Sequence, residues 1–266
     1  MDVLKAVYGS DNVTGSFSEG LVVRANNEPL EASIWVIETM LTGNISKRVV
    51  IPNAVLTGLE DITYLSVGSV SDERSYYKSL EKHTLRKLDE WEHEKYLDVC
   101  AADVQKWIAS RAKEIKAQGF DGWWLDNVDV YEEYKSTETY KAMGAILSSV
   151  KALGGYVMVN GGMEYLQKAM NADSGHKGLG SVDGVTQEEV FSMITDYGDG
   201  EKDKGKFGTQ TSKQSSEYQS HLKRVIRHKM QAFLLEYTTD NTLKLRISAY
   251  CKTTGAMACI SSDVNL

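Results

Sequence analysis

The feature that most constrains this chain is a regular alternation of short apolar runs with longer amphipathic segments. Six runs have the length and composition of β-strands: residues 62–68, 120–126, 156–160, 182–191, 232–237 and 255–261. Three longer segments carry apolar residues at the 3.6-residue period of a helix: residues 99–119, 139–155 and 215–230. Strands that alternate with helices indicate βα units and a parallel sheet.

Two further runs near the N-terminus, 20–25 and 34–38, bring the candidate strands to about eight, the number that closes a barrel. We therefore predict an α/β fold, a single (β/α)8 TIM-type barrel over residues 1–266. The length suits one such domain, and no G-x-G-x-x-G motif follows a strand to favour an open dinucleotide-binding sheet. The periodicity of residues 1–60 is weak, and no linker divides the chain.

The composition excludes several classes of function. The net charge is −7 and the pI about 5.4, so nucleic acid is a poor partner and a cationic substrate is favoured. No run of 18 apolar residues predicts a membrane span, and no leader is visible at the start. The three cysteines and five histidines lack metal-site spacing, so we expect no metal and no cofactor. Residues 198–208 predict an exposed, mobile loop.

Polar residues finish five successive candidate strands, where a purely structural sheet has little use for them. They are Ser66, Asp126, Asn160, Glu188 or Glu189, and Glu236. In a (β/α)8 barrel the active site collects at the carboxyl ends of the strands. With no serine-nucleophile elbow in the chain, hydrolytic chemistry would depend on carboxylates.

Several acids in this set also have structural interpretations. Asp129 and Glu132 form a D-x-x-E variant of the capping box, so Asp129 either caps a helix or contacts substrate. Asp126 either shapes a turn or acts as a catalytic carboxylate. Asp121 faces away from the barrel interior by strand parity, as a structural acid would. Trp124 is either a core residue or a platform for a sugar ring.

The chain resembles the endo-α-1,4-polygalactosaminidase family of glycoside hydrolases, family 114. The most specific matching motif is GFDGWWLDNVDVY at 119–131. Other motifs match in order: residues 64–77, 91–99, 157–162, 184–191 and 233–240. The resemblance implies a (β/α)8 barrel that cleaves α-1,4-linked, partly deacetylated galactosamine polymers, and it suggests an extracellular or cell-envelope location.

The resemblance also implies the site residues. The two catalytic carboxylates fall on Asp126 and Glu188, with Glu189 as the alternative to Glu188; we assign Asp126 as nucleophile and Glu188 as acid/base. The expected substrate-binding residues are Tyr64, Ser66, Trp124, Asn127, Asp129, Asn160, Glu189, Glu236 and Tyr237, with Glu236 a partner for a substrate ammonium. The chain departs from the family pattern at Ser69, where an acid is usual, at 236–238, and over residues 1–60.

Two other functions are compatible with the sequence. The divergent N-terminal region and Ser69 are compatible with a barrel that binds a glycan without cleaving it. A structural or partner-binding protein with the same fold is the third alternative, because a fold alone does not establish chemistry.

Overall fold

The computed structural model of the protein describes residues 61–89, 91–198 and 205–262. In the N-terminal region it describes the backbone of four strands: β1 (Gly20–Val23), β2 (Pro29–Leu30), β3 (Val36–Leu41) and β4 (Asn44–Val50).

A ten-stranded sheet forms the centre of the described fold, and its six middle strands run parallel in the order β15–β14–β11–β10–β9–β5. Their bounds are β5 (Asp61–Ser66), β9 (Gly122–Asp126), β10 (Tyr156–Asn160), β11 (Gly184–Glu188), β14 (Gln231–Tyr237) and β15 (Met257–Ser261). Each corresponds to one of the six strands expected from the sequence. Because they are parallel, their carboxyl ends meet at one edge, where barrel enzymes place their active sites.

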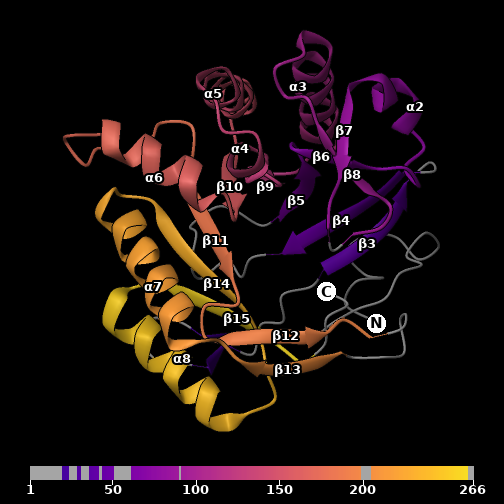
Figure 1. Cartoon of the computed structure of the whole chain (residues 1–266). Helices are drawn as coiled ribbons and strands as arrows, with labels where there is room; N and C mark the ends of the chain where they lie inside the picture. The colour runs from indigo at the N-terminus through magenta and orange to yellow at the C-terminus, as the bar shows by residue number, and fades with distance from the viewer. Residues whose placement is uncertain are drawn as a thin grey trace.

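The helices that follow these strands lie around the outside of the curved sheet (Figure 1). They are α3 (Ala102–Ala117), α4 (Val130–Glu133), α5 (Thr137–Lys151), α6 (Met163–Ala172), α7 (Ser212–Arg227) and α8 (Asn241–Thr254). Trp123 shows how they pack. Its side chain is fully buried between β9 and α3, and its indole N–H donates to the carbonyl of Ala112 at 3.2 Å. Burying an aromatic ring of this size contributes strongly to the core.

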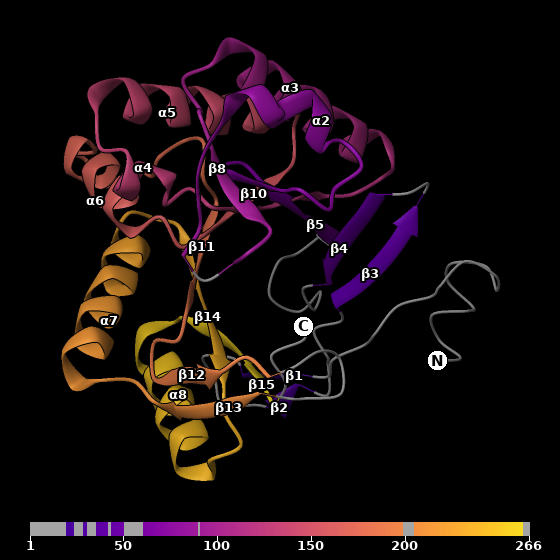
Figure 2. The same cartoon turned by 45° about the vertical axis from the view of Figure 1, so that its right-hand side comes forward.

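The N-terminal strands extend the parallel sheet on both sides through antiparallel pairings. β1 pairs with β15 and with β2, while β4 pairs with β5 and forms a hairpin with β3 (Figure 2). The two strands expected at 20–25 and 34–38 are therefore present as β1 and β3. They are not the parallel βα units that their position in the chain suggested.

Two antiparallel excursions interrupt the βα alternation beyond the carboxyl ends of the strands. The first lies between β5 and α3 and is a three-stranded sheet in the order β6 (Ser69–Ser71), β8 (Glu94–Leu97), β7 (Thr84–Lys87), with the short helices α2 (Tyr77–Leu80) and η1 (Glu81–His83). The second is the hairpin of β12 (Ser192–Asp196) and β13 (Lys206–Thr209), between β11 and α7. The expectation of a loop over 198–208 is thus wrong for 206–208, and residues 199–204 lie outside the described residues.

Candidate active site

A cleft of about 380 Å³ opens at the carboxyl ends of the parallel strands, between the two excursions. This volume is in the range of small-molecule and substrate sites. Its lining combines carboxylates, aromatic rings and one guanidinium: Tyr64, Arg74, Trp91, Glu94, Trp124, Asp126, Asn127, Asn160, Glu188, Glu189, Ile194, Tyr197, Leu235 and Tyr237.

Asp126 ends β9 inside this cleft and accepts three hydrogen bonds. Tyr64 O–H donates to its Oδ2 at 3.0 Å, and Asn127 Nδ2 donates to the same oxygen at 3.3 Å. Asn160 Nδ2 donates to Oδ1 at 3.1 Å. Hydrogen bonds donated to a carboxylate favour its ionised form, so these three donors suit a carboxylate that acts as an anion.

Glu188 ends β11 and faces Asp126 across Asn160. The same Asn160 amide nitrogen donates to Glu188 Oε1 at 2.8 Å, and Tyr237 O–H donates to Oε2 at 2.8 Å. Burial in the cleft raises the pKa of Glu188, the negative charge of Asp126 raises it further, and the donors Asn160 and Tyr237 oppose the rise. A raised carboxyl pKa is what a general acid needs near neutral pH.

The shared amide limits how far apart the facing oxygens of the two carboxyl groups can be. Distances of 3.1 Å and 2.8 Å from one nitrogen limit the separation of Asp126 Oδ1 and Glu188 Oε1 to at most 5.9 Å. If the two amide N–H bonds diverge by about 120°, the two oxygens lie about 5 Å apart. Carboxyl groups about 5–5.5 Å apart are typical of retaining glycosidases, and inverting enzymes need about 6.5–9.5 Å.

The two tyrosines that hold these carboxylates stay protonated donors. Burial raises the pKa of Tyr64 well above its ordinary value, and the charges of Asp126 and Glu94 raise it further. Burial likewise raises the pKa of Tyr237, and the charge of Glu188 adds to the rise. Each carboxylate therefore has one oxygen fixed by a neutral phenol and the other by the shared amide.

The backbone turns in the same unusual way after each carboxylate. Asn127 and Glu189 follow Asp126 and Glu188 directly, and both have positive φ, 62° and 58°. Non-glycine residues in this left-handed region cost roughly 1–2 kcal/mol and cluster at functional sites. Just after β5, the backbone at Gly68 lies very close to the turn at Asn127. A Cβ on Gly68 would lie 1.8 Å from the carbonyl oxygen of Asn127, so only glycine fits there.

Glu236 does not lie where the sequence prediction placed it. Its carboxylate is fully buried and accepts from Phe191 N at 3.0 Å, Ser192 N at 2.8 Å and Ser192 Oγ at 2.6 Å. Strand parity is the reason. Leu235 pairs in register with Glu188, so Leu235 and Tyr237 face the cleft and Glu236 faces the opposite way. Glu236 holds the turn after β11 and cannot meet a substrate ammonium.

Of the two roles predicted for Asp129, the helix-capping hydrogen bond is not formed. Asp129 occupies the N-cap position of α4, but its side chain makes no capping hydrogen bond. Burial, followed by the charges of Asp126 and Glu132, raises the pKa of Asp129 to about 7. Asp129 is absent from the cleft lining, and so is Ser66, whose Oγ accepts from Asn127 Nδ2 at 3.1 Å. Both residues lie next to the lining residues.

The other expected binding residues line the cleft. Trp124 lies on the same face of β9 as Asp126, and its indole nitrogen, buried, has no hydrogen-bond partner among the described residues. Glu189 lines the cleft, and its Oε1 accepts a short hydrogen bond from Ile194 N. These expected binding residues all come from the parallel strands or from the turns that follow them.

Four polar or aromatic cleft residues were not expected from the sequence: Arg74, Trp91, Glu94 and Tyr197. All four belong to the two excursions. Arg74, Trp91 and Glu94 fall within the family-like motifs at 64–77 and 91–99, but no local pattern places them or Tyr197 in the cleft, because they reach it only through the tertiary placement of the excursions.

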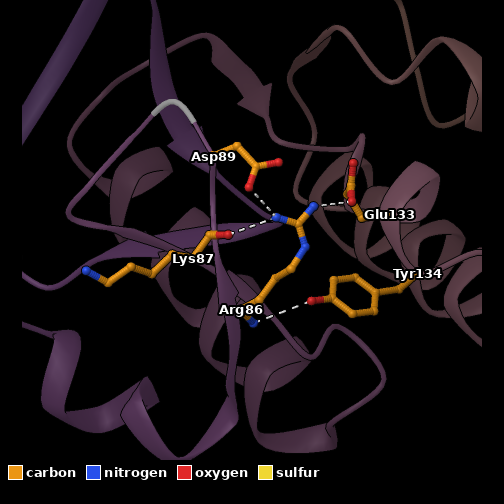
Figure 3. Close-up of polar contacts among 5 residues, drawn as sticks. All are labelled: Arg86, Lys87, Asp89, Glu133 and Tyr134. Atoms are coloured by element: carbon orange, nitrogen blue, oxygen red, sulfur yellow. Dashed lines mark hydrogen bonds and ion pairs between the residues drawn. The ribbon is translucent and has the colours of Figure 1, made fainter.

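An arginine ties the first excursion to the barrel (Figure 3). Arg86 on β7 donates through Nη1 to Lys87 O and Asp89 Oδ1, each at 3.0 Å, and through Nη2 in a short ion pair with Glu133 at the end of α4. Its backbone N–H also lies 3.4 Å from Tyr134 Oη. α4 follows the turn after Asp126, so this contact connects the excursion directly to the β9 strand end.

Within the described ranges, no group of three or more histidine, cysteine, aspartate or glutamate side chains is arranged to hold a metal ion. No helix in those ranges is long and apolar enough to cross a membrane.

Two solved structures resemble this fold. The glycoside hydrolase domain of PelA from Pseudomonas aeruginosa is 16% identical and has a TM-score of 0.58, with 76% of this chain and 78% of that chain covered. Ega3 from Aspergillus fumigatus, solved in complex with galactosamine, is 15% identical and has a TM-score of 0.55, with 76% and 74% covered. No curated protein matches the sequence.

A family model settles the relationship. The model of the glycoside-hydrolase family GH114 matches residues 11–263, nearly the whole chain. The family's structures are (β/α)8 barrels, so this match, together with the structural likeness, confirms the fold class and enzyme class expected from the sequence. The chain belongs to glycoside-hydrolase family GH114.

Proposed function

We propose that this glycoside hydrolase cleaves α-1,4-linked, partly deacetylated galactosamine polymers internally, as a single catalytic domain. The observation that carries the proposal is the pair Asp126 and Glu188, at the carboxyl ends of β9 and β11, joined through the Asn160 amide of β10, the strand between them. Two carboxyl groups at such a separation are the machinery of glycosidic bond cleavage.

The roles of the two carboxylates follow from their different surroundings. Three donors favour ionised Asp126, so we assign it as the nucleophile that attacks the anomeric carbon and forms a glycosyl–enzyme bond. Burial favours protonated Glu188, so we assign it as the acid that protonates the leaving oxygen. Once deprotonated, Glu188 takes a proton from the water that hydrolyses the intermediate. Net retention of anomeric configuration is the expected outcome.

The substrate class rests on charge and on the resemblances. The cleft contains the carboxylates of Glu94, Asp126, Glu188 and Glu189 against one guanidinium, Arg74, which favours a cationic glycan. The structure of Ega3 holds galactosamine, a sugar of this charge type. The proposed contacts to substrate come from the lining residues Tyr64, Trp124, Asn127, Asn160, Glu189 and Tyr237. Ser66 and Asp129 are proposed to support them from behind.

The direct test measures release of reducing ends from a galactosamine polymer by the wild type and by Asp126→Asn and Glu188→Gln. Each substitution keeps the shape of the side chain and removes its acid–base chemistry, so losses of several orders of magnitude are expected. Glu114→Gln, on an exposed turn of α3, is the matched control and should match the wild type. Wild-type rates in both cleft variants would refute the proposal. Tight binding of the polymer without cleavage by the wild type would identify a glycan-binding barrel instead.

A further inference from the structure

Two exposed aromatic rings from different excursions meet at the rim of the cleft. Trp91 precedes β8 in the first excursion, and Tyr197 follows β12 in the second. Their ring centroids lie 5.6 Å apart with an interplanar angle of 64°, and both rings line the same cleft as the carboxylate pair. Their exposed fractions are 52% and 45%.

The exposure of these rings needs a physical reason. Large aromatic side chains stabilise a fold most when they are buried. An exposed aromatic surface that borders a cleft therefore indicates a binding surface. In the pair of Trp91 and Tyr197, the edge-to-face contact fixes the orientation of both rings while leaving nearly half of each accessible. The flat apolar face of a sugar ring stacks on such a surface.

A carboxylate is attached to this aromatic pair by a tight turn. The Glu94 N–H donates to the Trp91 carbonyl at 3.0 Å, so one turn carries both side chains into the cleft. The Ser69 hydroxyl donates to Glu94 Oε2 at 2.7 Å, and the Ser66 and Ser69 hydroxyls lie 3.0 Å apart. The carboxylate is therefore fixed relative to the end of β5, which reduces the entropy lost when it binds a ligand.

The turn itself is held from both sides. The backbone N–H of Asp72 donates to the His93 carbonyl at 2.9 Å, and the His93 ring lies 3.1 Å from the Asp72 carboxylate. The Arg86 contact of Figure 3 fixes the same small sheet to α4. The rim residues thus have a defined position relative to Asp126.

We propose that Trp91, Tyr197 and Glu94 form an outer subsite that binds one amino-sugar unit with a free ammonium group. The sugar ring packs against the aromatic pair and the ammonium group pairs with Glu94. This inference rests on the proposed function, since it places a neighbouring unit of the same polymer. A neutral, bulkier acetamide forms no ion pair with Glu94, so the subsite selects deacetylated units.

The test compares α-1,4-galactosamine oligosaccharides that are fully deacetylated with fully N-acetylated ones of the same length. Glu94→Gln should lower kcat/KM on the deacetylated oligosaccharides by roughly tenfold, mainly through KM, because it removes a charge-assisted hydrogen bond. It should change kcat/KM on the N-acetylated oligosaccharides by no more than about twofold. Glu92→Gln is the matched control. It makes the same chemical change in the same turn, on an exposed side chain outside the cleft lining.

The aromatic pair is tested in the same assay. Trp91→Ala and Tyr197→Ala should each raise KM by several-fold on both oligosaccharides, because stacking on the ring face does not depend on acetylation. Leu245→Ala, which shortens an exposed apolar side chain on α8, should leave KM unchanged. Equal losses on the two oligosaccharides in Glu94→Gln, or a loss no larger than that of Glu92→Gln, would overturn the subsite.

Failure of the subsite is distinguishable from failure of the proposed function. If Asp126→Asn is inactive while Glu94→Gln and Glu92→Gln behave alike, the subsite alone is wrong. If Asp126→Asn keeps wild-type rates, the proposed function is wrong. Should the wild type cleave neither oligosaccharide, titration calorimetry with the same ligands and variants makes the same comparison through Kd.

Discussion

Replacing Asn160 with leucine tests the arrangement of the two carboxylates most directly. Leucine has nearly the shape of asparagine but cannot donate, so Asn160→Leu removes the hydrogen bonds to Asp126 Oδ1 and Glu188 Oε1 together. The two carboxyl groups then lose the one side-chain donor that contacts both of them among the described residues.

The expected magnitude follows from the two bonds. A hydrogen bond to a charged group contributes about 1.5–3 kcal/mol, and two bonds to one amide are not fully additive, so we expect a loss of about 3 kcal/mol of transition-state stabilisation. At about 1.4 kcal/mol per tenfold change, kcat/KM falls on the order of 100-fold. The pKa of Glu188 rises further, because the Asn160 donor favours its ionised form. The alkaline limb of the pH–rate profile therefore moves to higher pH.

The assay is kcat/KM on a galactosamine polymer from pH 4 to 9, with thermal melting of each variant as the check on folding. Asn171→Leu is the control, because it makes the same change on the exposed surface of α6, where Asn171 accepts a short hydrogen bond from Arg224. Its kcat/KM should stay within about twofold of the wild type. A loss below threefold in folded Asn160→Leu would refute the shared role of this amide. A shift of the alkaline limb to lower pH would refute the electrostatic reasoning.

Three further predictions concern groups around this centre. Tyr237→Phe removes the donor to Glu188 Oε2, so the alkaline limb of the pH–rate profile should move up; a downward shift would contradict this. The pKa of Glu236 is raised to about 7 by burial, so its stabilising effect is present below about pH 4.5 and is lost as pH rises through 7. The free energy of unfolding of the wild type, measured in urea, should fall by up to about 3 kcal/mol between pH 5 and pH 8, and Glu236→Gln should lack this fall. The same change in both proteins would contradict the assignment. Asn127→Ala should be about 1 kcal/mol less stable to urea than Asn127→Gly, because both lose the amide and only alanine resists φ of 62°.

The parallel sheet could be predicted because its strands are marked locally. Each of the six is a short apolar run bounded by polar residues or glycine, and alternation within 120–126 puts the buried Trp123 and the cleft residue Asp126 on opposite faces of β9. Helix α8 also carries local start and stop signals. Asp240 caps it, and Gly255 ends it with a positive φ of 81°.

The wrong assignments share a different cause. Glu236 and Tyr237 were both expected in the cleft, although adjacent residues of a strand point to opposite faces. Only the register with β11 decides which one enters, and register is a property of the pair of strands. Trp91, Glu94 and Tyr197 depend still more on long-range structure. Their place at the cleft is set by contacts between excursions that lie about 100 residues apart in the chain.

The geometry of the sheet explains why an asparagine on β10 can hold both acids. β10 lies between β9 and β11, so the strands that carry Asp126 and Glu188 are two spacings apart, roughly 9–10 Å between their backbones. Side chains on the shared face must bridge that gap, and the residue on the middle strand lies between them. Asn160 pairs in register with Thr186, so Glu188 lies two residues, roughly 7 Å, farther along β11 on the same face. The longer glutamate side chain reaches back over that rise, and the shorter aspartate reaches across. An exchange of Asp126 and Glu188 would therefore keep both charges and lose the spacing that the Asn160 amide sets.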